Sequence, residues 1–166
     1  MPKLKCSLSL DLDNLWSYLK THGDAGWDAY PSYLNVVVPR VLDFLDARGV
    51  RITWFIVGRD AADPAHRAAL REIPARGHEV GNHSFNHEPW LHLYSEVAIR
   101  DELARTEDAI HAATGERPTG FRGPTSASAR RCSRCWPSAA TATTLRRFRR
   151  SWGRWRGCTT SPPPRG

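Results

Sequence analysis

Short strand-like runs and longer helix-like spacings of apolar residues alternate along the first three quarters of the chain. Strands are predicted where apolar or β-branched residues form short runs, at 5–12, 51–57, 78–82 and lastly at Phe121 and Arg122. Helices are predicted where apolar residues recur every three or four positions, at 34–48, 63–77 and 95–115. Because strands and helices alternate, the pattern predicts an α/β fold with parallel strands.

Local signals mark the ends of these elements. Asp63 followed by Pro64 is typical of an N-cap and a first helical position, and Pro74 is expected to weaken the last turn of that helix. The helix that begins after Ser95 has its apolar positions at Val97, Ile99, Leu103 and Ile110. Residues 15–32 show no clear period and are expected to form a long connection.

The length and hydropathy of the chain limit the kind of protein it can be. It has 166 residues, 40% of them hydrophobic, which is enough for one domain with its own core. Its purely apolar runs, such as 36–38 and 54–57, are far shorter than the roughly 20 residues of a membrane-spanning helix. The first ten residues lack the apolar stretch of a secretory signal. No membrane partner is expected, and the cytoplasm is the expected location.

The net charge of +7 is concentrated at one end of the chain. Residues 1–124 hold 14 Lys and Arg against 17 Asp and Glu, a balance of −3. Residues 125–166 hold ten Arg and no Lys, Asp, Glu or His, together with three of the four cysteines and three of the seven tryptophans. The chain therefore divides into two parts, 1–124 and 125–166, that need separate explanations.

Side chains able to bind a metal gather at the predicted carboxyl ends of the strands, where α/β folds bind their ligands. Asp11 and Asp13 end the first strand, His83 follows the third, and Arg122 lies at the fourth. His83 and His87 are four residues apart, so a helical turn would bring both imidazoles to one side, within reach of one cation. A carboxylate would complete a three-ligand set. Two histidines on a solvated turn are the alternative for this pair.

The two aspartates can take different roles at such a cation. One carboxylate would bind the metal, and the other would take a proton from water. Alternation along a strand points Asp11 and Asp13 to the same side of the sheet, which favours a shared site. Arg122 would keep one of these carboxylates ionised and oriented. The alternatives are a surface charge for Arg122 and solvated carboxylates, with Asp13 and Asn14 capping the next turn.

Three segments resemble the first three motifs of the polysaccharide deacetylase family, also called the NodB-homology family. They are Ser9-Leu10-Asp11-Leu12-Asp13, His83-Ser84-Phe85-Asn86-His87 and Gly120-Phe121-Arg122-Gly123-Pro124, and residues 77–82 resemble the usual lead-in to the second. The resemblance covers residues 5–124. It implies a partial distorted β/α barrel whose C-terminal strands are missing or non-native, with residues 1–124 as the N-terminal portion of a deacetylase-like catalytic domain.

The resemblance implies a role for each candidate site residue. Asp11 would be the catalytic base, and Arg122 would orient it. One divalent metal, expected to be Zn²⁺, would be bound by Asp13, His83 and His87. In the commonest form of the family the two aspartates are adjacent, whereas one leucine separates them here, so which of them is the base and which the ligand stays open.

The implied reaction is metal-assisted hydrolysis of a non-peptide carbon–nitrogen bond, most often the removal of an N-acetyl group from an amino sugar. The expected substrate is a glycan or a small N-acylated compound. Trp90 and Pro124 are the expected substrate-binding residues, and Trp27 is a further candidate for an apolar wall against a sugar ring. Core packing is an equal alternative for the two tryptophans.

Residues 125–166 favour a different class of function. Arginines interleaved with Phe148, Trp152 and Trp155 are typical of a nucleic-acid surface. The Cys132-Ser133-Arg134-Cys135 segment is a single C-x-x-C without a second pair, which does not indicate a zinc site. A nucleic-acid-binding protein is therefore an alternative to the enzyme, and an inactive truncated fragment of such an enzyme is another.

The composition of residues 125–166 predicts an out-of-frame translation of GC-rich DNA, with no ordered structure. The family continues after its third motif with further strands, a substrate-groove motif and a histidine that acts as general acid, yet this part contains no histidine or carboxylate. In a shifted frame, residues 135–143 permit Leu-Ala-Glu-Arg-Gly-Tyr-Arg-Tyr-Asp, a helix end and a strand. Such a chain would be a partial barrel with exposed strand edges, poorly stable and with little or no activity. A genuine basic extension is the alternative.

Overall fold

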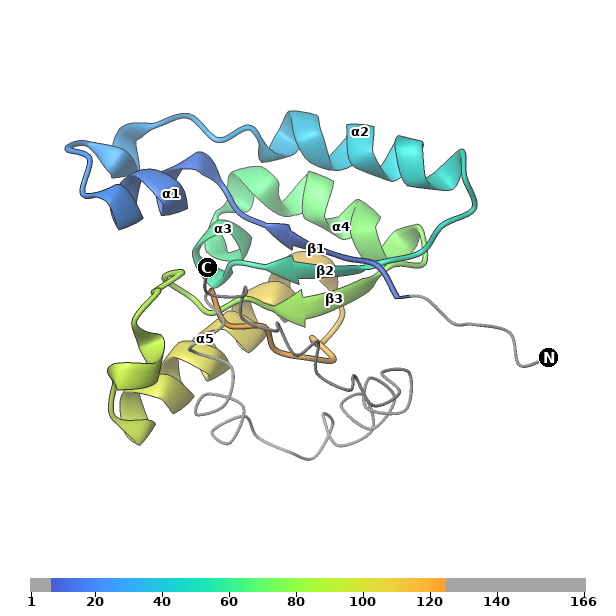
Figure 1. Cartoon of the computed structure of the whole chain (residues 1–166). Helices are drawn as coiled ribbons and strands as arrows, with labels where there is room; N and C mark the ends of the chain where they lie inside the picture. Colours follow the sequence, from blue (N-terminus) through green and yellow to red (C-terminus); the bar gives the residue numbers. More distant parts are fainter. Residues whose placement is uncertain (1–6, 125–166) are drawn as a thin grey trace, which may run out of the picture.

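The computed structural model of the chain describes residues 7–124 (Figure 1). The predictions made for residues 125–166, including the Arg-rich tail and its C-x-x-C segment, lie outside the described residues. The described elements, in chain order, are β1 (Ser9–Leu12), α1 (Leu15–His22), η1 (Trp27–Ala29), α2 (Leu34–Asp46), β2 (Thr53–Ile56), α3 (Gly58–Ala62), η2 (Pro64–His66), α4 (Arg67–Ala75), β3 (Glu79–Asn82), η3 (Leu91–Leu93) and α5 (Glu96–Thr114).

The three strands form a parallel sheet in the order β1-β2-β3, with helices in the connections between them (Figure 1). This confirms the predicted α/β fold with parallel strands. The fourth predicted strand is reduced, among residues 7–124, to one parallel bridge between Asn82 and Phe121. The backbone N–H of Arg122 nevertheless donates to the carbonyl of Asn82 at 2.9 Å, so this segment extends the edge of β3. The carboxyl ends of the strands therefore lie together, as the candidate site requires.

The two faces of the sheet carry different side chains because residues alternate along a strand. Leu12, Trp54, Ile56 and Val80 point to one face and are buried in the main core with residues of α2, α4 and α5. The α2 residues in this core, Leu34, Val38, Leu42 and Leu45, recur at helical spacing. Burial of each such side chain contributes about 1.5–3 kcal/mol. The opposite face carries Asp11 and Phe55, and it is the face on which the candidate site lies.

Glycine is required at one position of this second face. A Cβ added to Gly81 would lie 2.5 Å from the ring of Phe55 on the neighbouring strand. The Phe55 ring in turn lies beneath the Arg122 guanidinium, whose central carbon is 4.2 Å from the ring centroid. The absence of a side chain at Gly81 thus gives room for the aromatic surface on which Arg122 rests.

The structure corrects three predictions about helices. The connection predicted over 15–32 contains α1, which is capped by Asn14 through its side-chain oxygen and by Gly23 in the left-handed conformation. The single helix predicted from Asp63 is preceded by α3 and opens with η2, because Pro64 holds Asp63 in an extended conformation that ends α3. Val97, predicted to face the core from α5, is 79% exposed.

The remaining helix boundaries agree with the local signals. Ser95 caps α5 by accepting a hydrogen bond from the N–H of Ala98, and Gly115 ends it in the left-handed conformation. Asp63 caps η2 by accepting from the N–H of Ala65. Pro74 lies inside α4, which ends one residue later at Ala75, as expected for a weakened last turn. No helix within residues 7–124 has the length and apolar character needed to cross a bilayer.

Candidate functional site

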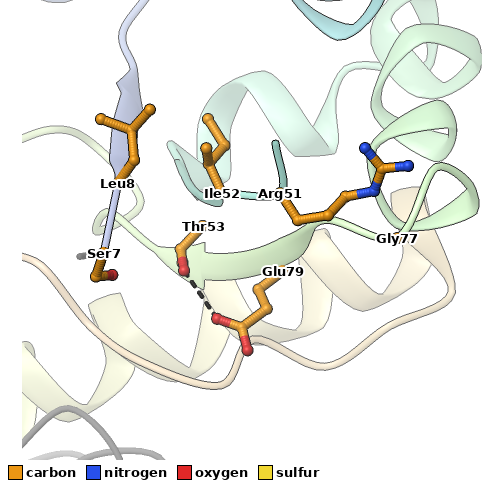
Figure 2. A pocket seen from close by; sticks show the side chains of 7 residues that line it. All are labelled: Ser7, Leu8, Arg51, Ile52, Thr53, Gly77 and Glu79. Carbon is orange, nitrogen blue, oxygen red and sulfur yellow. Dashed lines mark hydrogen bonds between the residues drawn. The ribbon is translucent and has the colours of Figure 1, made fainter. Parts of the chain in front are cut away.

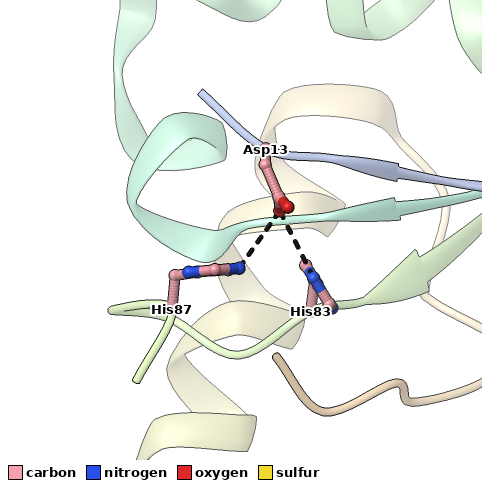
Figure 3. Close-up of side chains that lie close together, drawn as sticks. All are labelled: Asp13, His83 and His87. Carbon is pink, nitrogen blue, oxygen red and sulfur yellow. Dashed lines mark ion pairs between the residues drawn. The ribbon is translucent and has the colours of Figure 1, made fainter. Parts of the chain in front are cut away.

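Asp13, His83 and His87 converge at the carboxyl ends of the strands (Figure 3). Asp13 follows β1 directly and His83 follows β3 directly, so the parallel sheet brings them together although they are 70 positions apart. Nε2 of His83 lies 3.3 Å from Oδ1 of Asp13, and Nε2 of His87 lies 3.2 Å from the same oxygen. Both imidazoles are almost completely buried, and the Asp13 side chain is 12% exposed.

The three side chains fit a divalent cation. Oδ1 of Asp13 and Nε2 of His87 are buried and make no well-formed hydrogen bond with any described residue, although they lie within 3.2 Å of each other. Two ligand atoms each about 2.0–2.1 Å from a tetrahedral metal would be about 3.3–3.4 Å apart, which is close to the two spacings observed. Burial alone would raise the pKa of Asp13, but electrostatic attraction from the two nearby histidine side chains holds that pKa well below its usual range. Asp13 is therefore a carboxylate, the form that binds metal.

The backbone of Arg122 determines the tautomer of His83. Nδ1 of His83 lies 2.8 Å from the carbonyl oxygen of Arg122. A carbonyl oxygen only accepts, so Nδ1 carries the proton in this hydrogen bond and, in the neutral ring, Nε2 keeps its lone pair towards Asp13. A partner of this kind on the far nitrogen is what orients a metal-binding histidine.

The two histidines do not lie on a helical turn, contrary to the prediction from their spacing. They belong to a loop in which Ser84 and His87 adopt positive φ angles of 63° and 49°. Such angles are uncommon outside glycine, and the surrounding hydrogen bonds stabilise them here. The carbonyl of Ser84 accepts from the N–H of Gly58, the carbonyl of Phe85 accepts from the N–H of Arg59, and the N–H of Ser84 donates to Oδ1 of Asn82.

Glu102 of α5 holds the middle of this loop. Its Oε1 accepts from the backbone N–H of Asn86 at 2.6 Å, and its Oε2 accepts from the Asn86 side-chain amide at 2.9 Å. From the other side, Lys20 donates to the carbonyl of Asn86 at 3.0 Å and pairs with Glu88 at 3.1 Å. This role of Glu102 was not among the predictions made from the sequence. The available signal was a carboxylate close to buried apolar residues of a helix, where an acidic residue needs a partner.

Asp11 forms a second part of the site. Nη1 of Arg122 donates to Oδ1 of Asp11 at 2.5 Å, and Nη2 of Arg122 donates to the hydroxyl of Ser9. The side chains of Asp11 and Arg122 are about one-third exposed, whereas Asp13 is mostly buried. The structure thus places Asp13 with the histidines and Asp11 with the arginine.

Two tyrosines contact Asp13, and neither was predicted from the sequence to lie at the site. The hydroxyl of Tyr18 donates to Oδ2 of Asp13 at 3.1 Å, and the hydroxyl of Tyr33 donates to the main-chain carbonyl of Asp13. Partial burial and the negative charge of Asp13 raise the pKa of Tyr18 to about 12, so its hydroxyl remains protonated and able to donate. Burial, with the same nearby charge, also raises the pKa of Tyr33.

Behind Asp13, a buried network supports the turn into α1. Oδ1 of Asp60 accepts from the side-chain amide of Asn14 at 3.0 Å and from Nε1 of Trp16 at 2.9 Å. The Asn14 amide also donates to the hydroxyl of Ser32. Burial raises the pKa of Asp60 despite these hydrogen bonds, and its Oδ2 has no hydrogen-bond partner among the described residues. This network keeps the backbone of residues 13–15 in position.

The expected substrate-binding residues lie in different settings. Trp90 precedes η3 and is 63% exposed, so core packing does not account for it. Pro124 is half-buried, at the end of the described residues. Trp27 packs against Trp16, with ring centroids 5.7 Å apart, and against the Arg59 guanidinium, which is typical of a structural contact rather than a free sugar platform.

A pocket opens at the opposite end of the sheet (Figure 2). Thr53 and Glu79, the first residues of β2 and β3, line it together with Arg51 and Gly77. The Thr53 hydroxyl donates to Oε2 of Glu79 at 2.8 Å, so these two polar groups satisfy each other. Because this pocket lies at the amino ends of the strands, it is separate from the Asp13 and histidine site.

Comparisons of the sequence identify related proteins. The profile of the family described as polysaccharide deacetylase matches residues 24–140. This range includes His83, His87 and Arg122, begins after the two aspartates and ends beyond residue 124. A peptidoglycan-N-acetylglucosamine deacetylase from Bacillus cereus is 30% identical over 86 residues, which are 52% of this chain and 30% of the relative.

Solved structures with similar folds include two of family 4. An acetyl xylan esterase from Clostridium thermocellum, in complex with a cobalt ion, matches 71% of this chain and 47% of its own with a TM-score of 0.54 and 30% identity. A CE4 family pseudoenzyme from Bacillus anthracis matches 78% of this chain and 38% of its own, with a TM-score of 0.58; at 24% identity it shows likeness of fold alone. These matches confirm the predicted fold class. The chain spans less than half the length of each of these three proteins.

Proposed function

The chain belongs to the polysaccharide deacetylase family, and from this we propose that it is a metal-dependent hydrolase that removes an N-acyl group from a carbohydrate. The observation that carries the proposal is the convergence of Asp13, His83 and His87 on one point, beside an Asp11 carboxylate held by Arg122. Three ligand-type side chains leave a bound cation open to further ligands, which is the arrangement of a catalytic rather than a structural site.

Each residue has a defined task in this proposal. Asp13, His83 and His87 would hold the divalent cation, expected to be Zn²⁺. When bound, such a cation polarises the substrate carbonyl and lowers the pKa of water. Asp11 accepts the proton from the attacking water, and Arg122 keeps the accepting carboxylate directed into the site through the 2.5 Å hydrogen bond to Oδ1. The carbonyl of Arg122 simultaneously orients His83, so one residue positions both halves of the site.

The proposed substrate class is an N-acetylated amino sugar, alone or in a glycan. A small amide is the nearest alternative. The names of the relatives support the carbohydrate, since they include a deacetylase of peptidoglycan N-acetylglucosamine. The exposed ring of Trp90, three residues after His87, offers the apolar face on which a sugar ring stacks. On this basis we assign Trp90 to substrate binding, and Pro124, two residues after Arg122 in the third motif, is the second residue that we propose for this role.

An inactive fragment of such an enzyme is the second candidate. The observation that favours it is the composition of residues 125–166, the part of the chain that follows the third motif. The expected general acid of the family is a histidine after the third motif, and residues 125–166 contain no histidine. The inactive candidate retains the metal site but releases no acid from any amide.

The test combines elemental analysis of the purified full chain with a screen for acetate release from N-acetylated sugars, oligosaccharides and small amides. An active enzyme contains one divalent metal per chain, and Asp11→Asn retains that metal while turnover falls about 10²–10⁴-fold. The matched control is Asp24→Asn. It removes an exposed carboxylate in the loop after α1 and leaves turnover unchanged. Metal without turnover on any substrate supports the inactive fragment. A fully active Asp11→Asn variant contradicts the role of Asp11.

A further inference from the structure

The two carboxylate oxygens of Asp13 have different surroundings. Oδ1 lies 3.2–3.3 Å from Nε2 of both histidines, whereas Oδ2 accepts a hydrogen bond from the hydroxyl of Tyr18 at 3.1 Å. An unrestrained carboxylate can rotate and offer either oxygen, or both, to a cation. Here a donor occupies one oxygen and leaves the other directed at the histidines.

Packing does not explain why a tyrosine occupies position 18. The side chain lies in the first turns of α1 and is 49% exposed, while its neighbours Trp16 and Ser17 are the residues that α1 buries. Helical side chains lean towards the N-terminus of the helix, so the Tyr18 hydroxyl reaches back to the residue that precedes the Asn14 cap. The network of Asn14 with Asp60 and Ser32 holds this first turn, and thereby the base of Tyr18, in place.

We infer that Tyr18 is a positioning residue that makes Asp13 a one-oxygen ligand of the metal, an inference that rests on the proposed metal site. The phenol donates to Oδ2, so that Oδ1 alone faces the cation. A carboxylate bound through both oxygens would add one donor atom to the coordination shell and would crowd the positions that water and substrate use. Tyr33 contacts the same residue through its main chain, because its hydroxyl donates to the carbonyl of Asp13.

The test compares the full-length wild type with Tyr18→Phe, which removes only the hydroxyl. Zn²⁺ affinity is measured by competition with a chelator, and the Co²⁺-loaded protein is measured by visible absorption. Without the hydroxyl, we expect about 10–100-fold weaker Zn²⁺ binding, the usual effect of losing a group that orients a ligand. We also expect weaker Co²⁺ absorption bands, because their intensity falls as the coordination number rises. Tyr30→Phe, a change at another half-exposed tyrosine, is the matched control and leaves both measurements unchanged.

The outcomes separate this inference from the proposed function. If the wild type takes up no metal, the metal site fails and the inference fails with it. If the wild type binds metal and Tyr18→Phe matches it in either affinity or Co²⁺ spectrum, the metal site stands and the role of Tyr18 is wrong. The melting temperature of the metal-free protein explains such a result. If Tyr18→Phe loses Zn²⁺ affinity, keeps the Co²⁺ spectrum and melts at a lower temperature, Tyr18 only stabilises the fold and does not position Asp13.

Discussion

Glu102 provides the sharpest test of how the fold supports the site, because it touches none of the candidate metal ligands. The perturbation is Glu102→Ala. It removes two hydrogen bonds from a buried carboxylate to Asn86, at 2.6 and 2.9 Å, and leaves the Asn86 backbone N–H without its acceptor. A hydrogen bond to a charged group contributes about 1.5–3 kcal/mol, and neighbouring bonds are not additive, so we expect the free energy of unfolding to fall by about 2–4 kcal/mol.

Glu102→Ala should also weaken metal binding, because Glu102 holds the loop that carries His83 and His87. Asn86 lies between His83 and His87, and the positive φ angles of Ser84 and His87 persist only while the surrounding contacts hold them. We therefore expect Zn²⁺ affinity to fall at least about tenfold, in the range seen when groups that orient metal ligands are removed. Glu102→Gln should lose much less of both quantities, because an amide oxygen still accepts from the Asn86 N–H and the Asn86 side chain can turn to pair with the amide nitrogen.

The assay is urea unfolding of the metal-free chain, followed by Zn²⁺ titration under native conditions. Asp101→Ala on the same helix is the matched control, since the ion pair that Asp101 forms with Arg105 at 3.8 Å is exposed and its loss should cost less than about 0.5 kcal/mol. The slope of the free energy against urea concentration should be equal among the variants, so that midpoints compare directly. The reasoning is refuted if Glu102→Ala is as stable as Asp101→Ala and binds Zn²⁺ as tightly.

Three further predictions concern the metal, the pH dependence and the gene. Replacement of His83 or His87 by alanine should remove the bound metal from the purified protein. An unchanged metal content would contradict the assignment of these residues as metal ligands. Burial raises the pKa of Asp60 above its unfolded value of about 3.9, so the stabilisation from its protonated form is complete below that pH and is lost as the pH rises through the raised pKa. Asp60→Asn should therefore gain stability relative to wild type as the pH rises above about 4, and stability curves that stay parallel above that pH would contradict the predicted direction of this change. Resequencing of the gene should show a change of reading frame near the codons for 123–126, whereas an intact frame and a tryptic peptide from residues 125–166 of the native protein would show a genuine extension.

The periodicity and capping signals of the sequence were sufficient for most elements of the fold. Apolar spacing and local end signals placed α2, β2, β3 and α5 to within a few residues, because these elements depend on neighbours near in sequence. The helix α1 was missed, since only eight residues contribute to its pattern and its stability comes from the Asn14 cap and contacts far along the chain. The exposure of Val97 could not be read from spacing, because α5 packs on the rest of the fold with only part of its apolar surface.

Some features of the candidate site also follow from the sequence, and others follow only from the tertiary structure. The sequence by itself determined the residue types, the order of the motifs and their position after predicted strands, because a parallel sheet brings the carboxyl ends of its strands to one edge. Only the tertiary structure decided that Asp13 lies with the histidines and Asp11 with Arg122, that the histidines lie on a loop held by Glu102 instead of a helical turn, and that Tyr18 contacts Asp13. These facts depend on contacts between residues that are distant along the chain or on unusual backbone angles, and no local pattern of hydrophobic and polar positions encodes either.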